Sequence, residues 1–312
     1  MRTPLMSPIR RMKPASVRHV PLRSGDNLRG ALVMALSMVA FGLNDTVMKF
    51  VAQDLPLYQS ITLRGVMVMV FIAAVAPRLG GLSLNIPAPA RGPMAWRSLG
   101  EVASTVLFLN ALQNMAMGDL SAIMQALPLV VMVAAALFFG ETLGWRRISA
   151  VIFGFLGVLL ILRPGGAVFG AWAVVALGAM AMVAVRDLAT RGFDRHISSA
   201  TIAFYAAAGV TLTGFLLSLV QGWVMPDLIQ ILLLATGAAI LTVGYVTAVA
   251  AMRVGEISYV APFRYTSLLV AILMGLLVFG EWPDLWTWAG SAMVVTAGIY
   301  TIWREAQLGK VR

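Results

Sequence analysis

The sequence predicts an all-α integral membrane protein with ten transmembrane helices in two inverted five-helix repeats. Three observations predict this fold class. Of the 312 residues, 60% are hydrophobic and 12% are charged, which leaves too few polar residues to cover a water-soluble domain. A Gly-acid-x-Ser sequence occurs twice and opens an apolar run that ends in Phe-Gly-Glu, at 118–141 and again at 255–281. Finally, almost all basic residues fall on one side of the predicted spans.

A helix crosses about 30 Å of hydrocarbon with roughly 20 apolar residues. Ten segments reach this length, separated by prolines or short polar turns. In chain order they are residues 30–52, 57–77, 95–116, 119–140, 146–163, 168–187, 197–220, 227–252, 256–280 and 285–303. They form a first repeat at 30–163 and a second at 168–303, between a basic, disordered tail at 1–29 and a carboxy-terminal tail at 304–312.

The distribution of charge orients these spans. With the amino terminus inside, nineteen of the 23 lysines and arginines lie on the inner side, one (Arg163) on the outer side, and three within spans. This asymmetry predicts a multi-pass protein of the bacterial inner membrane with both termini in the cytoplasm. Since each repeat has an odd number of spans, the second copy is inverted. Glu141 then ends a span at the inner face and Glu281 at the outer face, as cap or gate elements.

Several motifs carry a resemblance to a known family. Both halves pair an early-proline span with a terminal Gly-Glu, and Leu63-Arg64 and Ala261-Pro262-Phe263-Arg264-Tyr265 occur in the second and ninth spans. Over residues 28–304 the chain resembles the EamA family of the drug/metabolite transporter superfamily. The resemblance implies secondary active transport of a small metabolite by alternating access, without ATP. The sequence at Asn44-Asp45 resembles that of the branch with riboflavin and S-adenosylmethionine uptake carriers. Export of amino acids or drugs is the alternative to uptake.

Charged side chains within spans mark the expected pathway, because each costs about 2.5–3.5 kcal/mol at the centre of a span. Asp45 either forms an ion pair with Lys49, four residues on, or binds a substrate or a proton. Glu101 is a candidate for proton coupling because burial disfavours the charged form, and the alternative is an ion pair with a nearby arginine. Arg64 and Arg264 either bind an anionic group or hold loop carbonyls or Glu101.

Polar side chains elsewhere in the spans complete the candidate site. Asn110 and Asn114 form part of a polar stripe on one helix, and a proline in each of the fourth and ninth spans is expected to kink the helix and shape a cavity. For each polar residue the alternative is a hydrogen bond between helices. The expected substrate contacts are Asn44, Asp45, Arg64, Asn110, Asn114, Gln125, Tyr245, Arg264 and Tyr265, and a loose counterpart of Asn44-Asp45 is Arg186-Asp187.

Other function classes lack the residues that they need. Both histidines, His19 and His196, fall in predicted cytoplasmic segments without metal-site spacing, the acids are scattered, and a phosphate-binding loop is missing. We expect no enzymatic activity, catalytic residue, metal, cofactor or nucleic acid. The expected partners are a small-molecule substrate and the lipid bilayer, and glycines in the fifth and tenth spans are compatible with a homodimer. A channel, a scaffold or a sensor is the alternative function; an intramembrane enzyme based on Lys49 is least favoured.

Overall fold

The computed structural model describes residues 24–139, 144–163, 170–190, 197–254 and 257–309, and within these ranges every regular element is a helix. The first half contains α1 (Ser24–Val51), α2 (Leu57–Val75), the 3-10 helix η1 (Ala76–Leu79), α3 (Ala88–Asn114), α4 (Met117–Met124), α5 (Leu127–Phe139) and α6 (Trp145–Leu162). The second half contains α7 (Ala171–Thr190), α8 (Ser199–Gln221), α9 (Leu228–Val254), α10 (Ile257–Val260), the 3-10 helix η2 (Ala261–Tyr265), α11 (Thr266–Phe279) and α12 (Leu285–Gly309).

The helices confirm the predicted membrane fold. In the described part of the chain, nine helical segments are long and apolar enough to cross a membrane. The remaining predicted span, 95–116, corresponds to α3, which has 27 residues but also carries Arg97 and Glu101. Boundaries differ at the ends, since α1 begins at Ser24 and α12 continues to Gly309. The first and last helices therefore extend into the segments that the sequence assigned to tails.

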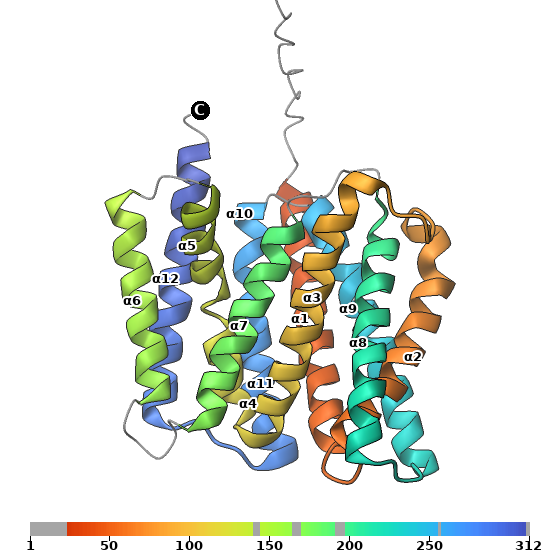
Figure 1. The fold of residues 1–312 in the computed structure, drawn as a ribbon. Helices are drawn as coiled ribbons and strands as arrows, with labels where there is room; N and C mark the ends of the chain where they lie inside the picture. The colour runs from red at the N-terminus through yellow and green to blue at the C-terminus, as the bar shows by residue number, and fades with distance from the viewer. Residues whose placement is uncertain (1–23, 140–143, 164–169, 191–196, 255–256, 310–312) are drawn as a thin grey trace, which may run out of the picture.

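Helices of one repeat pack mainly against helices of the other repeat. In Figure 1 the long helices stand side by side, and α1 begins at the same end at which α12 finishes. The first helix of each repeat packs along the third helix of the other, α1 with α9 and α7 with α3. The second helices, α2 and α8, pack together, and so do the last helices, α6 and α12. The same helix pairs result when each helix is replaced by its equivalent in the other repeat. This symmetry is the arrangement expected of an inverted duplication.

The fourth span of each repeat is interrupted rather than continuous. In the first repeat, α4 ends before a turn at Gln125 and Ala126, and α5 resumes one residue before Pro128. In the second, the 3-10 segment η2 contains Pro262 and separates α10 from α11. Proline lacks the N–H that a helix interior requires, so both breaks have a local cause. The predicted disturbance of both spans at their prolines is confirmed.

Glycines bring α6 and α12 into backbone contact at one edge of the bundle (Figure 1). A Cβ atom added to Gly157 would lie 2.8 Å from the carbonyl oxygen of Gly290, and one added to Gly290 would lie 2.5 Å from the carbonyl oxygen of Gly157. Small residues allow such close approach between membrane helices. These glycines form a contact between two helices of the same chain, and the homodimer stays a prediction.

We expect Gly157→Ala to lower the free energy of unfolding by about 1–3 kcal/mol, since the added methyl group overlaps backbone atoms that cannot move aside. Thermal unfolding of the purified protein in detergent measures this loss. Gly92→Ala in α3 is the matched control, because nothing lies within 4 Å of its added Cβ. Equal melting temperatures for the two variants would show that α6 and α12 are not in close contact.

Candidate functional site

A cavity of about 560 Å³ lies between helices of both repeats. Its walls come from α1, α2, α3, α4, the start of α5, α7, α9, η2 and α11. The lining reaches Thr190, the exposed last residue of α7, at the end of the bundle where the chain begins and ends. Towards the other end it reaches Met117, the first residue of α4. Its volume lies within the roughly 300–1,000 Å³ that is usual for small-molecule sites.

The lining contains most of the polar residues that the sequence singled out. Seven of them meet here: Asn44, Asp45, Arg64, Glu101, Gln125, Tyr245 and Arg264. Three further charged residues, Arg97, Arg186 and Asp187, belong to the same cavity and were not among the predicted contacts. The charged side chains of the lining are therefore four arginines and three carboxylates. This charge balance favours a neutral or anionic molecule over a cation.

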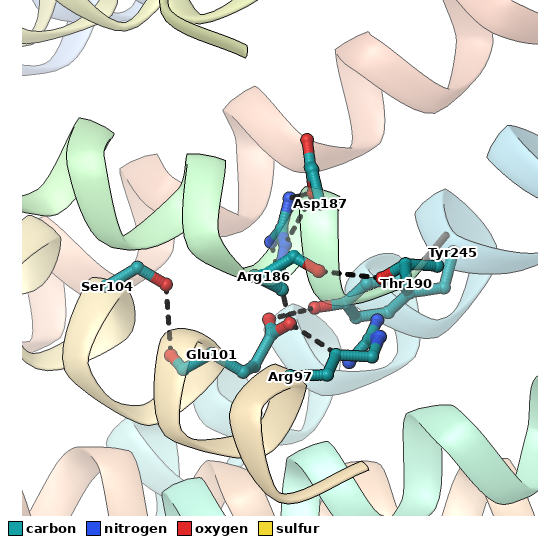
Figure 2. A network of polar contacts seen from close by, with 7 residues as sticks. All are labelled: Arg97, Glu101, Ser104, Arg186, Asp187, Thr190 and Tyr245. Atoms are coloured by element: carbon teal, nitrogen blue, oxygen red, sulfur yellow. Dashed lines mark hydrogen bonds and ion pairs between the residues drawn. The ribbon is translucent and has the colours of Figure 1, made fainter. Parts of the chain in front are cut away.

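Glu101 is the centre of a polar network between α3, α7 and α9 (Figure 2). Its side chain is buried, and its carboxylate lies 3.4 Å from Nη1 of Arg97 and 3.5 Å from Nη1 of Arg186. The Tyr245 hydroxyl donates a hydrogen bond to Oε1 of Glu101 at 3.3 Å, and Arg186 also binds Asp187 at 2.9 Å. The ion-pair alternative for Glu101 is thus confirmed. Two guanidinium groups thus neutralise this carboxylate.

Local sequence brings the members of this network together. Arg97 and Glu101 are four residues apart, so they lie on the same face of α3. Gly100, beside Glu101, lets α7 approach closely, because an added Cβ would lie 2.9 Å from the backbone nitrogen of Arg186. The glycine therefore places the Arg186 side chain next to the Glu101 carboxylate. Loss of this close approach would separate the charges.

A second polar group joins α1 to α2 deeper in the cavity. Arg64 donates through Nη1 to the Asn44 side-chain oxygen at 3.0 Å, and the Asn44 amide donates to Asp45 at 3.1 Å. Arg64 is only 6% exposed, yet its Nε has no hydrogen-bond partner. Among the described side chains, Asp45 forms no ion pair, and Lys49 binds Glu281 instead. The interpretation of Asp45 and Lys49 as a self-contained ion pair is therefore wrong.

The two helix interruptions meet inside the bundle. Gln125, in the turn between α4 and α5, donates to the Ser267 hydroxyl at 2.6 Å. Ser267 in turn donates to the backbone carbonyl of Arg264 in η2 at 3.0 Å. The Arg264 side chain is exposed and contributes to the cavity wall. The broken helices thus supply polar groups to the cavity from both repeats.

An ion pair joins the segments beyond the far end of the cavity. Nζ of Lys49 lies 2.5 Å from Oε1 of Glu281 and donates to the Met115 carbonyl at 2.8 Å. The other oxygen of Glu281 accepts the Met117 N–H at 2.8 Å, at the amino terminus of α4. Glu281 therefore connects α1, the start of α4 and the end of α11. Its predicted counterpart, Glu141, lies outside the described residues.

Three predicted contacts lie outside the lining of this cavity. Asn110 donates to the Val106 carbonyl at 2.7 Å and to the Tyr58 hydroxyl of α2 at 3.4 Å, and Asn114 donates to the Asn110 carbonyl at 2.8 Å. Both amides therefore bond within their own helix, and Asn110 also bonds to a neighbouring helix. Tyr265 is buried against α12, where a Cβ on Gly298 would overlap its hydroxyl. The three missed residues had a sequence signal: Arg97 lies four residues before Glu101, and Arg186-Asp187 is the loose counterpart of Asn44-Asp45.

Comparison with known proteins identifies relatives over the whole bundle. A model of the EamA-like transporter family matches residues 28–163 and 170–304. A riboflavin transporter of Vibrio cholerae is 28% identical over 95% of this chain and 99% of its own length. A riboflavin transporter of Rhizobium johnstonii is 26% identical over 88% of this chain and 91% of its own.

Two further matches are more limited in what they show. An S-adenosylmethionine uptake transporter of Rickettsia bellii is 26% identical over 58% of this chain and 62% of its own length. A protein of known crystal structure matches with a TM-score of 0.62 at 17% identity, over 87% of this chain and 95% of the other. At that identity the structural likeness supports the fold alone.

Proposed function

Because this chain belongs to the EamA-like transporter family, we propose that it is a secondary active transporter for a heteroaromatic metabolite of the riboflavin type. The observation that carries the proposal is the cavity between the two repeats, where the buried Arg64 keeps an unpaired donor. An unsatisfied buried donor is expected to bind an acceptor atom of the substrate, since leaving it unpaired costs about 1–3 kcal/mol. The nearly full-length match to riboflavin transporters supports the same substrate class.

The cavity wall suits a flat aromatic ring. Phe41, Phe108 and Tyr245 contribute to it, and the rings of Phe41 and Tyr245 pack edge to face with centroids 5.4 Å apart. Aromatic side chains provide stacking surface, and methionines such as Met38 and Met124 adapt to irregular apolar shapes. Riboflavin has an uncharged ring system and a polar side chain, which fits this combination of aromatic and polar walls.

S-adenosylmethionine is the second candidate, and Asp45 is the observation that favours it. The Asp45 carboxylate forms no ion pair among the described residues, so a cationic sulfonium or ammonium group could approach it. Against this, the four arginines of the cavity outnumber its three carboxylates. We therefore place riboflavin first.

We further propose that protons drive transport through Asp45 rather than Glu101. Glu101 is held by Arg97 and Arg186, whereas the hydrogen bond described for Asp45 comes from the neutral amide of Asn44. Arg64 acts on Asp45 electrostatically but forms no ion pair with it, so the carboxylate can change its protonation state as the cavity changes its access to water. The excess of basic residues at the termini supports an inner-membrane protein with both ends in the cytoplasm. The cavity would then open to the cytoplasm, with Lys49 and Glu281 closing the outer side.

Reconstitution tests this function directly. The purified protein is expected to bind riboflavin in detergent and to catalyse saturable riboflavin uptake into proteoliposomes, with weak competition by S-adenosylmethionine. Transport that does not saturate would identify a channel, and stronger competition by S-adenosylmethionine would reverse the order of the two candidates. If the protein neither binds nor takes up either compound, the proposed substrate class is overturned.

A further inference from the structure

A second, smaller cavity lies beside the first. It has a volume of about 230 Å³ and is lined by α2, α3, α8 and α9, with Thr190 at the end of α7. Most of its wall is aliphatic, with Val68 and Ile72 from α2, Ala203 and Ala206 from α8, and Leu241 from α9. We call it the side pocket. Its alanines leave the space that larger side chains would fill.

The side pocket and the main cavity share a polar wall. Arg64, Glu101 and Tyr245 contribute to the lining of both, as do Arg97 and Thr105. The two spaces therefore adjoin each other at the buried charged groups. A lipid acyl chain would gain nothing from this polar end, whereas a molecule with one apolar edge and one polar edge would match both spaces.

Arg64 lies at this junction with an unused donor. Its Nη1 binds Asn44, while its Nε is buried without a partner. Arginine carries five N–H donors in a fixed plane, so a second acceptor can be bound without breaking the bond to Asn44. The geometry thus calls for an acceptor atom located between the polar and the apolar parts of the bound molecule.

We propose that the side pocket binds the apolar aromatic edge of the transported molecule, while Arg64 binds an acceptor atom of its ring and the main cavity holds the rest of the ring and its polar side chain. This inference rests on the proposed function and specifies how the ring is selected. A flavin has acceptor nitrogen and carbonyl atoms in its ring system, and its far edge is a benzene ring with two methyl groups. The side pocket then distinguishes ring systems by the size of that edge.

Binding of two flavins by the purified full-length protein tests this assignment. Riboflavin is expected to bind roughly tenfold more tightly than the analogue that lacks both ring methyl groups, because each buried methyl contributes to affinity. Ala206→Leu fills the side pocket and should weaken riboflavin binding at least tenfold while removing the preference for the methylated ring. Ala208→Leu is the matched control, since Ala208 is on the same helix but lines neither cavity; it should keep both affinities.

A second variant tests the same inference independently, in case Ala206→Leu does not fold. Val68→Ala enlarges the side pocket and should improve binding of an analogue with ethyl groups in place of the methyl groups, relative to riboflavin. Equal effects of Ala206→Leu on both flavins, or an unchanged preference in Val68→Ala, would overturn the inference while the proposed function stands. Absence of riboflavin binding by the wild-type protein would overturn both. A tightly bound lipid found by mass spectrometry and displaced by Ala206→Leu without any change in flavin binding would assign the pocket to lipid.

Discussion

Asp45→Asn is expected to abolish proton-driven accumulation of substrate and to leave exchange of substrate across the membrane intact. The asparagine keeps the size of the side chain and can still bond to Asn44, but it cannot take up a proton. Exchange needs only the movement of the loaded carrier, whereas accumulation needs a proton to bind and dissociate once per cycle. Proteoliposomes with an imposed pH gradient measure accumulation, and preloaded vesicles without a gradient measure exchange.

Glu101→Gln serves as the comparison for Asp45→Asn. Removal of the Glu101 charge leaves Arg97 and Arg186 with less compensation, and breaking a buried pair by removing one partner costs about 3–5 kcal/mol. We expect a lower melting temperature for Glu101→Gln, with residual transport that still responds to the pH gradient. If Asp45→Asn accumulates substrate as the wild-type protein does, while Glu101→Gln loses its response to pH, then Glu101 rather than Asp45 couples transport to protons.

Lys49→Met is expected to shift the transporter towards a state that is open to the outside. The substitution leaves the Glu281 carboxylate without its cation, and such a loss costs about 3–5 kcal/mol. Because every 1.4 kcal/mol is about tenfold in an equilibrium constant, the ratio of the closed to the open outer side should fall more than a hundredfold. The double variant with exchanged charges, Lys49→Glu and Glu281→Lys, should restore part of the closed population.

Thiol labelling from outside intact cells measures this shift. The chain contains no cysteine, so Met117→Cys introduces a single reporter beside the ion pair. Met117 is 2% exposed, and we expect slow labelling by a membrane-impermeant reagent in the otherwise unchanged protein and fast labelling with Lys49→Met. Met225→Cys, at a position that is already 93% exposed, controls for reagent access. Equal labelling of Met117→Cys in both backgrounds would show that the ion pair does not close the outer side.

The order of the spans could be predicted because it depends on local composition, and their sidedness stays a prediction. Apolar length defines a span, and an excess of basic residues defines its inner side. The breaks at Pro128 and Pro262 also have a local cause. By contrast, the pairing of α1 with α9 and of α3 with α7 depends on the shapes of distant helices. Those pairings decide which polar residues face each other.

The site was predictable only where its contacts are close in sequence. Proximity in the sequence allowed an ion pair between Glu101 and a nearby arginine, and Arg97 forms it. The same reasoning paired Lys49 with Asp45, since Glu281, its actual partner, is 232 residues away. Asn110 and Asn114 looked like a lining stripe, but amides in an apolar helix can bond to carbonyls one turn earlier. Periodicity shows which face is polar without showing what that face meets.

The exchange of partners between repeats has a consequence for biosynthesis. The chain leaves the ribosome with α1 complete at Val51, and its partner α9 begins only at Leu228. At about 5–20 residues per second, α1 waits on the order of ten seconds or longer before α9 is made. Throughout that interval Asp45 and Lys49 lie in a helix without its final neighbours. The insertion machinery must therefore keep this helix apart from the lipid until α9 is made. The first five spans alone cannot form the main cavity or the side pocket, because both cavities also need helices of the second repeat.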